Sequence, residues 1–406
     1  MRGGSGNSSV MSGWMFRIVL VLVIGVLGYL STAQTLGFSI RKSDPARAFT
    51  LASRDGRVVA LFAQQMAGAT AKDRTVGDEL SRRAILMDPT AVPALASLGL
   101  SFQARGNIAA AKRLFAYAQH LTRRDLQVQV WAIEDAVGRG DISSALHHYD
   151  IALRTSAQAP ALLFPILASA IGDLSIRKAL TATLTARPAW ASSFIEFAGT
   201  NQSDPVATAQ LYLELQRARV PIPQAANAKI IATLLSLDKI DVAWSYYAAL
   251  HPGLSRNASR QANFVGVPDE PSAFDWAPIN DNGITTSIER RGQRSSFEMA
   301  TAATIGGSLL QQLQVLPPGS YRITGRSADI NQPMASQPYW SLTCRDGREL
   351  GRVEVPDSAK NGGRFTGRFD VPLGCPVQVL VLTARSSDAI GGLSGRIENV
   401  LLSPLN

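Results

Sequence analysis

The chain contains two cysteines, Cys344 and Cys375, and both lie in its C-terminal third. Cys344 ends a predicted strand, and Cys375, about 30 residues later, lies in the turn before the predicted strand Val377–Arg385. No CxxC spacing or nearby histidine accompanies them, which argues against a redox or zinc site. In an oxidising compartment we therefore expect a disulfide, worth roughly 3 kcal/mol by the chain-entropy estimate.

Carboxylates are present, but they follow no catalytic pattern. The sequence has no GxSxG, Walker A, HExxH or dinucleotide GxGxxG motif. A glycosidase needs two carboxyl groups at a set separation, and sequence supplies no distance for Asp275, Glu289, Glu298 or Asp370. We predict that the chain is not an enzyme, and a glycan-processing activity is the least favoured function.

Histidines do not form a metal site in this pattern. All four lie in the predicted helical region, so the C-terminal region has none for acid–base chemistry. His147 and His148 are adjacent, which points them in different directions on a helix, and no cysteine or carboxylate completes a ligand set. We expect an exposed helix face there.

Three aromatic residues of the C-terminal region, Trp276, Tyr339 and Trp340, are the candidates for ligand binding. The C–H faces of sugars stack on aromatic rings, beside polar groups that hydrogen-bond the hydroxyls. The alternative is structural. Tyr339 and Trp340 are adjacent on a predicted strand, so one of them faces the core, and Trp276 would cover one end of the domain.

Beyond residue 253 the sequence predicts an antiparallel β-sandwich. Prolines, glycines and polar turns separate short runs of alternating character, and Pro317-Pro318-Gly319 is a strong turn signal. About nine short strands in this region indicate a sandwich or jelly roll. The predicted strands are Gly283–Arg290, Ser295–Ala300, Ser308–Leu316, Gly319–Ser327, Tyr339–Cys344, Gly351–Val355, Arg364–Val371, Val377–Arg385 and Gly395–Leu402.

The order of short motifs in this region carries a resemblance. The motifs are Phe274-Asp275-Trp276, Leu310–Leu313, Leu316–Arg322, Tyr339–Cys344 and Phe369–Pro372 followed by Cys375-Pro376. Together they resemble the carbohydrate-binding-module-like jelly roll that ends bacterial tetratricopeptide proteins of the exopolysaccharide-associated type. The resemblance implies a fold and a role near envelope polysaccharide, and it does not by itself establish sugar binding. Many such modules hold a structural calcium, for which Asp275 and Glu398 are the weak candidates; no other cofactor or metal is expected.

Residues 45–252 show an internal period of 34 residues. Ala84, Ala118, Ala152 and Ala186 share this spacing, as do Ala111, Ala145 and Ala179. Small residues at these two phases suit the close crossing of two helices in a hairpin, and Phe115 and Tyr149 would fill the space between repeats. With Leu95, Leu98, Gly99 and Phe102, the unit containing Ala111, Phe115 and Ala118 resembles the tetratricopeptide repeat.

A solenoid of about five or six such hairpins buries a continuous core and leaves a concave groove. Grooves of this kind bind a peptide or a protein partner, which is the function we favour for this region, although no groove residue is assigned. The alternative is that the helices only hold the next domain away from the membrane. Asp73, Asp141 and Asp204-Pro205 are expected at helix starts.

The N-terminal segment Trp14–Leu30 has an uninterrupted apolar core from Ile18. Arg2 and Arg17 precede that core and no acidic residue does, so we expect a cytoplasmic N-terminus and an exported bulk. Residues 14–33 can form a transmembrane anchor, with Arg17 reaching the interface, or a signal segment cleaved near Ser31-Thr32-Ala33. Both fates place the bulk of the chain in the periplasm, and the anchor would make it a single-pass protein of the inner membrane.

The net charge of +9 does not imply nucleic-acid binding. From residue 264 onward 13 Lys and Arg face 14 Asp and Glu, so the excess lies in the first two-thirds of the chain. It is spread along predicted helices without interleaved aromatic residues, which favours a solvated face or a surface that meets an anionic membrane or acidic polymer.

These observations predict a cytoplasmic tail (1–13), an anchor or signal segment (14–33), tetratricopeptide-like repeats (45–252), a linker (253–272) and a jelly roll (273–406). The favoured function is a periplasmic accessory or scaffold protein in envelope polysaccharide assembly or export. In it the solenoid binds protein and the sandwich contacts glycan. The second hypothesis is a purely structural adaptor, in which both domains bind protein and no sugar is bound.

Overall fold

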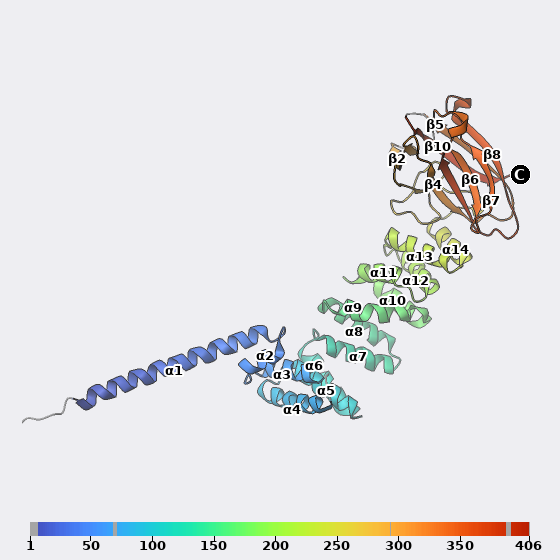
Figure 1. Cartoon of the computed structure of the whole chain (residues 1–406). Coiled ribbons are helices and arrows are strands. Elements are labelled where there is room, and N and C mark those ends of the chain that lie inside the picture. The colour runs from blue at the N-terminus through green and yellow to red at the C-terminus, as the bar shows by residue number, and fades with distance from the viewer. Residues whose placement is uncertain (1–6, 68–70, 293, 387–390, 406) are drawn as a thin grey trace, which may run out of the picture. The chain divides into compact units, whose positions relative to one another are not determined.

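The computed structural model describes residues 7–67, 71–292, 294–386 and 391–405. The chain divides into two compact units, Met1–Leu163 and Phe164–Asn406. Among the described residues, the first unit contains helices alone, and the second contains helices followed by a β-sandwich (Figure 1). The predicted fold class is therefore confirmed: an N-terminal apolar helix, an all-α repeat region and a C-terminal antiparallel β-sandwich.

Helix α1 (Asn7–Ile40) contains the stretch Trp14–Ile40, which is long and apolar enough to cross a membrane. Its most hydrophobic window has a mean hydropathy of 2.1, and none of that window is buried within the protein. The apolar helix continues beyond residue 33 to Ile40, and near this end Gly37 packs closely against Ala52. By length and composition this helix is consistent with a membrane anchor and equally with a signal sequence.

Helical hairpins form the rest of the first unit. In α3/α4, α5/α6 and α7/α8 each helix packs against its successor. A short helix, α2, precedes them. The bounds are α2 Pro45–Leu51, α3 Gly56–Met66, α4 Ala71–Met87, α5 Val92–Ala104, α6 Ile108–Leu121, α7 Leu126–Gly138 and α8 Ile142–Thr155. Side-chain oxygens cap the N-termini of most of these helices, through Asp44, Asp55, Asn107, Asp125 and Asp141. Asp73 lies in the first turn of α4.

The hairpin α5/α6 shows why small residues recur in this region. A Cβ on Gly99 would lie 2.7 Å from the ring of Phe115, so only glycine allows this crossing. Phe115 in turn stacks on Trp131 of α7, with 4.2 Å between the ring centroids. The residues expected at the repeat interfaces lie as follows: Ala84, Leu95, Gly99, Ala111, Phe115, Ala118, Ala145, Tyr149 and Ala152 are buried, and Phe102 is partly buried.

Helix α9 (Ala159–Ser169) contains the boundary between the units, and the second unit continues with five further α-helices. They are α10 Leu174–Thr185, α11 Ala191–Thr200, α12 Pro205–Arg217, α13 Gln224–Ser236 and α14 Ile240–Leu250, with a short 3-10 turn, η1 Ala170–Gly172, before α10. Asp173 and Asp204 cap α10 and α12, and Pro205 is the first residue of α12. Helices α13 and α14 pack on each other as a hairpin, and α12 contacts both.

The 34-residue period fails in this second group of helices. Asn107 and Asp141 cap successive second helices of a hairpin and are 34 residues apart, but the next cap, Asp173, follows after only 32. The packed face of α10 therefore moves to Leu180 and Leu184. Ala179 is only partly buried and Ala186, the C-cap of α10, is exposed, so the expected packing role of Ala186 is wrong.

The position that does persist is the fourth residue after each N-cap. It is Ala111, Ala145, Arg177, Thr208 and Ala243 in α6, α8, α10, α12 and α14, and all five are buried. Counting from the cap keeps this position on the same face of each helix, whatever the length of the preceding turn.

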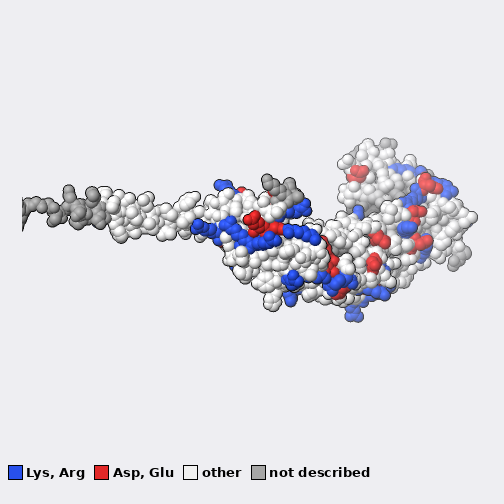
Figure 2. Space-filling model, turned by 90° about the horizontal axis from the view of Figure 1, so that it is seen from below, with Lys and Arg blue, Asp and Glu red and all other residues white. Residues whose placement is uncertain are grey.

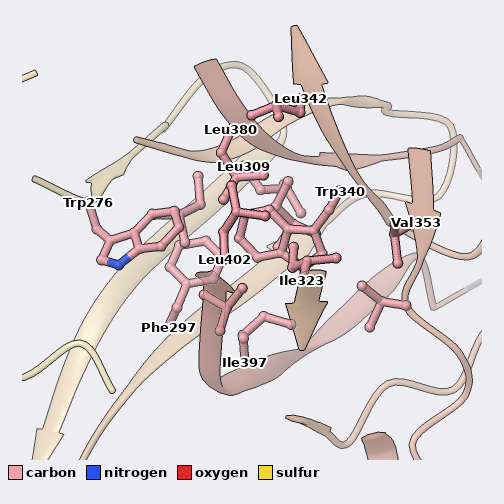
Figure 3. Close-up of a cluster of buried hydrophobic side chains, with 14 of the residues drawn as sticks. Trp276, Phe297, Leu309, Ile323, Trp340, Leu342, Val353, Leu380, Ile397 and Leu402 are labelled. Atoms are coloured by element: carbon pink, nitrogen blue, oxygen red, sulfur yellow. The ribbon is translucent and has the colours of Figure 1, made fainter. Parts of the chain in front are cut away.

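The sandwich consists of two five-stranded antiparallel sheets. Sheet A has the order β1-β4-β9-β6-β7, and sheet B has the order β2-β3-β10-β5-β8. The bounds are β1 Ala277–Pro278, β2 Ile284–Arg291, β3 Arg294–Thr301, β4 Gly307–Gln314, β5 Gly319–Ala328, β6 Tyr339–Cys344, β7 Glu349–Glu354, β8 Arg364–Val371, β9 Gln378–Ala384 and β10 Leu393–Pro404. Alternate residues of both sheets meet in one apolar core (Figure 3).

Candidate functional site

A hollow of about 860 Å³ lies on the helical hairpins of the first unit. Residues of α3, α4, α5 and α7 line it, together with the C-caps of α3 and α5. Its apolar contacts are Ala67, Leu100 and Ala104, and charged and amide side chains surround them. We call this hollow the groove. It has the size and the mixed lining that suit an extended polypeptide segment.

The charges of the groove are only partly compensated. Asp78 is buried on α4 and forms an ion pair with Arg105, and it also accepts a hydrogen bond from Ser101 Oγ at 2.8 Å. Arg74 and Arg82 are exposed on α4, and no hydrogen bond or ion pair joins either to the described residues. The groove therefore presents two guanidinium groups that are open to an acidic partner.

Hydrogen-bonding groups also line the groove. Gln64 of α3 donates to Gln127 of α7 across it, at 2.6 Å. The hydroxyl of Ser97 on α5 is buried and finds no hydrogen-bond partner within the described ranges. Amide groups such as those of Gln64 and Gln127 can pair with the backbone of a bound peptide. No sequence signal marked these residues, because groove positions vary between repeats while the packing positions recur.

A buried polar network joins the helices of the second unit to the sandwich. Arg260, in the linker, is 2% exposed. Its Nε donates to the carbonyl of Phe274 at 2.9 Å, its Nη1 donates to Gln314 Oε1 at 3.1 Å, and a further bond reaches the carbonyl of Leu313. Its guanidinium group also lies over the ring of Trp244 of α14, 5.5 Å from the centroid. We call this region the junction.

Asp275 completes the junction. Its oxygens accept hydrogen bonds from Tyr247 Oη of α14 at 2.7 Å and from Ser272 Oγ at 2.7 Å. Burial raises the pKa of Tyr247, and the neighbouring Asp275 carboxylate raises it further. Burial lowers the pKa of Arg260 to about 10, so its guanidinium group stays charged at neutral pH. The network fixes a buried cation by carbonyl and amide oxygens and by the nearby carboxylate.

A second hollow, of about 410 Å³, opens beside the junction and is lined in part by His251, Asp269, Asp275 and Arg290. Throughout the part of the chain that the structure describes, no group of three or more His, Cys, Asp or Glu side chains could hold a metal ion.

Two of the three predicted ligand-binding aromatics lie in the sandwich core. Trp276 and Trp340 are fully buried and pack edge to face, with 5.7 Å between their ring centroids (Figure 3). Trp276 Nε1 donates to the carbonyl of Arg260 at 2.9 Å. A sugar at the surface cannot reach either ring, so their expected role as ligand contacts is corrected to a packing role. The physical reason is that large apolar rings near strand ends complete the core.

Tyr339 faces outward from sheet A, but its ring is covered. The guanidinium carbons of Arg352 and Arg385 lie 4.8 and 4.6 Å from the ring centroid. Arg385 is itself paired with Glu354 through two short bonds, of 2.8 and 2.6 Å. Cation–π contacts hold this cluster together. Tyr339 is therefore half-buried with two guanidinium groups against its ring, and its role as a ligand contact stays a prediction.

The two calcium candidates belong to different sites. The Asp275 oxygens accept hydrogen bonds in the junction, and those donors occupy the lone pairs that a cation would need. Glu398 of β10 forms ion pairs with Arg326 at 3.3 Å and Arg396 at 3.9 Å. Both carboxylates thus have other partners in this structure, and calcium binding by Asp275 and Glu398 stays a prediction.

The disulfide is confirmed. Cys344, the last residue of β6, is bonded to Cys375, which precedes β9, with 5.7 Å between the Cα atoms. Both residues are buried and belong to the sandwich core. The bond closes a segment of chain across two strands that also pair directly, β6 and β9.

Two strands of sheet B share a five-residue sequence pattern. The pentapeptides Arg322-Ile323-Thr324-Gly325-Arg326 and Arg364-Phe365-Thr366-Gly367-Arg368 share the pattern RxTGR. They lie on β5 and β8, which pair antiparallel, and the two segments face each other along their whole length. Self-similarity at five residues was the signal that could have revealed this site.

Charges of both signs alternate on the face of the protein shown in Figure 2. Many of the Lys and Arg residues there lie beside Asp or Glu, on the helices and on the sandwich. The described ion pairs follow the same trend, as in Arg57–Asp88 at 2.9 Å and Lys112–Asp135 at 3.0 Å. The positive net charge is thus spread and partly neutralised, as the sequence predicts.

No protein-family model matches this chain, and no curated protein matches it. Among solved structures, one similarity is to a protein described under the functional characterisation of Pseudomonas aeruginosa PilF, at 16% identity and a TM-score of 0.25. It covers 49% of this chain and 96% of that one. Another is to the enzymatically active domain of tailspike protein 4 of bacteriophage CBA120, at 13% identity, with a TM-score of 0.24 and 37% of this chain covered.

This chain spans 21% of the length of the tailspike domain. Similarities with TM-scores this low carry no argument about fold or function. The class of protein therefore rests on the helices and sheets themselves: an apolar N-terminal helix, helical hairpins with a groove, and a disulfide-bonded antiparallel sandwich.

Proposed function

We propose that this chain is a membrane-anchored adaptor whose groove binds a polypeptide segment of a partner protein. The observation that carries the proposal is the groove itself: about 860 Å³, formed by four helices of stacked hairpins, with apolar contacts below charged and amide side chains. Stacked helical hairpins offer such surfaces without needing a deep pocket.

The lining favours an acidic segment. Arg74 and Arg82 have no acidic partner within the described residues, whereas the buried Asp78 is already paired with Arg105. An incoming carboxylate can form charge-assisted hydrogen bonds with the two exposed guanidinium groups. Glu79 also lines the groove, which would select against segments with closely spaced acids on its side.

We further propose a compartment for the bulk of the chain and a role near envelope polysaccharide. The disulfide supports a periplasmic position for the bulk of the chain, since disulfides persist in oxidising compartments. The jelly-roll sandwich and its order of motifs support an accessory role in envelope polysaccharide assembly or export. A structural adaptor that binds protein alone is the competing function, and the two differ in whether the sandwich binds polysaccharide.

Site-specific photocrosslinking in cells tests the groove. A photoreactive amino acid at Arg82 or Gln127 should capture one partner, whereas the same amino acid at Tyr117, exposed on α6 outside the groove, should not. The identified partner, once purified, should bind the full chain in detergent. Arg74→Glu/Arg82→Glu should weaken that binding at least about tenfold, because it replaces attraction by repulsion.

Equal crosslinking from Tyr117 and from the groove positions would contradict the adaptor function. Unchanged affinity of the purified partner for the Arg74→Glu/Arg82→Glu variant would also contradict it, provided that the variant keeps the thermal unfolding midpoint of the native chain.

A further inference from the structure

The repeated pattern RxTGR places six side chains on one face of sheet B. Arg322 lies opposite Arg368, Thr324 opposite Thr366, and Arg326 opposite Arg364. All six residues are exposed. Residues directly opposite in an antiparallel pair point to the same side, so the six form two rows of Arg-Thr-Arg with an approximate twofold relation. We call this surface the Arg–Thr face.

Core packing accounts for the other positions of the pattern. Ile323 and Phe365 are buried between the sheets. Gly325 and Gly367 are required by close contacts, because an added Cβ would lie 2.2 Å from the ring of Phe365 in the first case and 2.2 Å from Val353 in the second. Nothing in the core requires arginine or threonine at the outward positions, although both strands have them.

The arrangement has a cost. Like charges directly opposite each other on paired strands are destabilising, and here this happens twice. Arg368 is compensated by Asp370 at 2.8 Å, and Arg326 by Glu398 at 3.3 Å. Arg322 and Arg364, at diagonal corners, form no hydrogen bond or ion pair with the described residues. Two exposed guanidinium groups therefore remain available for an external anion.

The neighbouring strand, β10, extends the face without an aromatic group, and its one carboxylate beside the six residues, Glu398, already pairs with Arg326. On β10, Asn399 lies opposite Arg326, Leu401 opposite Thr324, and Ser403 opposite Arg322. On the other side β8 is the edge of the sheet. The six residues are all exposed along two strands, which suits a polymer rather than a small molecule. Successive arginines along each strand are roughly 13 Å apart, at about 3.3 Å per residue.

We propose that the Arg–Thr face binds the carboxylate groups of an acidic polysaccharide. Guanidinium groups bind carboxylates through two parallel hydrogen bonds, and the threonine hydroxyls between them can both donate to and accept from sugar hydroxyls. This inference rests on the glycan role proposed for the sandwich, and it names the chemical class of that glycan.

Two observations favour this occupant over nucleic acid or a lipid surface. Single-stranded nucleic acid is held by aromatic side chains that stack on the bases, and β5, β8 and the facing part of β10 present none outward. Residues 264–406 carry 13 Lys and Arg against 14 Asp and Glu, a net charge of −1, so no long-range positive field attracts a dense polyanion. A polysaccharide with widely spaced carboxylates matches a local arginine cluster better than a densely charged polyanion does.

Binding of the full chain, in detergent, to immobilised polygalacturonate and alginate tests the proposal. Arg322→Ala/Arg364→Ala is the informative variant, because neither arginine has a partner that would be left unpaired. It should weaken binding to at least one of these polymers about tenfold or more. Binding by the native chain should also fall as salt is raised, since the contacts are ionic.

Arg113→Ala/Arg348→Ala removes the same charge from exposed positions outside the Arg–Thr face and should bind like the native chain. Arg322→Lys/Arg364→Lys keeps the charge but loses the paired hydrogen bonds, so it should fall between the two. Thermal unfolding midpoints within about 2 °C of the native value show that the variants remain folded.

The outcomes separate this inference from the proposed function. The chain could instead bind neutral dextran, with the same affinity in the Arg322→Ala/Arg364→Ala variant. This outcome would overturn the proposal that the glycan is acidic, while supporting a glycan role for the sandwich. Binding to phosphatidylglycerol vesicles or to DNA, but to neither acidic polysaccharide, would overturn it in favour of another polyanion. No polysaccharide bound at all would overturn both glycan proposals, and the adaptor function would still be judged by the groove crosslinks.

Discussion

Arg260 is the residue on which the connection between α14 and the sandwich depends most. Its buried guanidinium group donates to two carbonyl oxygens and to Gln314, and it lies over the ring of Trp244. Taking a cation out of water is costly, and the loss is offset only because each donor finds an acceptor and because Asp275 is near.

Replacing Arg260 by alanine should therefore destabilise the protein strongly. Removing one partner of a buried charged network costs about 3–5 kcal/mol, since Gln314 and the carbonyls lose their donor while staying buried. Thermal unfolding of the full chain, followed by near-ultraviolet circular dichroism, measures the effect. Arg256→Ala is the matched control. Arg256 pairs with the exposed Asp241 and donates to the carbonyl of Val315 at 3.0 Å, and because this side chain is partly exposed its loss should cost about 1–2 kcal/mol. Equal effects of the two substitutions would refute the role given to Arg260.

Single residues were the hardest part of this molecule to predict from sequence. Cys344 and Cys375 were assignable because a chain with two cysteines allows one pairing. Trp276 and Trp340 were not, because the same ring serves a core or a sugar site, and burial decides between them only after the sheets are stacked. Arg260 gave no signal, because an arginine in a linker is normally exposed.

At the scale of elements, local sequence patterns predicted more of the structure than they did for single residues. Predicted strands such as Tyr339–Cys344 and Arg364–Val371 agree with β6 and β8 to the residue, because alternation and turn residues report directly on a half-buried strand. The pairing of β5 with β8 could not be deduced, since it depends on the crossing of distant segments. The helical period held only while the turns kept one length, and it slipped by two residues at Asp173.

The helices α12 and α14 also contribute a pH dependence. Burial raises the pKa values of Tyr212, Tyr246 and Tyr247 above the ordinary value of 10, and burial lowers that of Arg260 to about 10. Above pH 10 the unfolded chain loses three phenol protons that the folded chain keeps, which favours unfolding. Arg260 has the opposite effect on the free energy of unfolding. Its pKa is lower in the folded chain, so above pH 10 the folded chain loses this one proton before the unfolded chain does. Stability should therefore change little between about pH 8 and pH 9.5 and fall above pH 10.

Urea unfolding between pH 9 and pH 11.5 measures this fall. Tyr246→Phe removes one of the three groups, so the slope of unfolding free energy above pH 10 should become shallower by about 1.4 kcal/mol per pH unit. The variant also loses the bond from Tyr246 to Asn227, a constant cost of about 1 kcal/mol. Tyr117→Phe, at an exposed position on α6, should leave the slope as it is. Identical slopes for Tyr246→Phe and the native chain would rule out this explanation.

At the scale of the whole molecule, two signals for membrane orientation conflict. The expectation of a cytoplasmic N-terminus counts Arg2 and Arg17, which precede the apolar core. Arg41, Lys42 and Arg47 follow α1, and the charge rule applied to both flanks would favour a cytoplasmic bulk. The disulfide points the other way, because thiols stay reduced in the cytosol. We give the disulfide more weight, since it is a property of the folded domain rather than of the flanks.

Thiol labelling in intact cells decides between these signals. If the bulk is periplasmic, Cys344 and Cys375 are bonded, and a maleimide polymer added after denaturation labels the chain only when a reductant is present. A version that begins at Arg41 lacks α1 and stays in the cytosol, so its two thiols should label without reductant. Its sandwich should also unfold at a lower temperature, because a bond closing about 30 residues contributes roughly 3 kcal/mol. Labelling of the full chain without reductant would place the groove and the Arg–Thr face in the cytosol. That result would contradict the proposed contact with envelope polysaccharide, because the Arg–Thr face must share a compartment with its ligand.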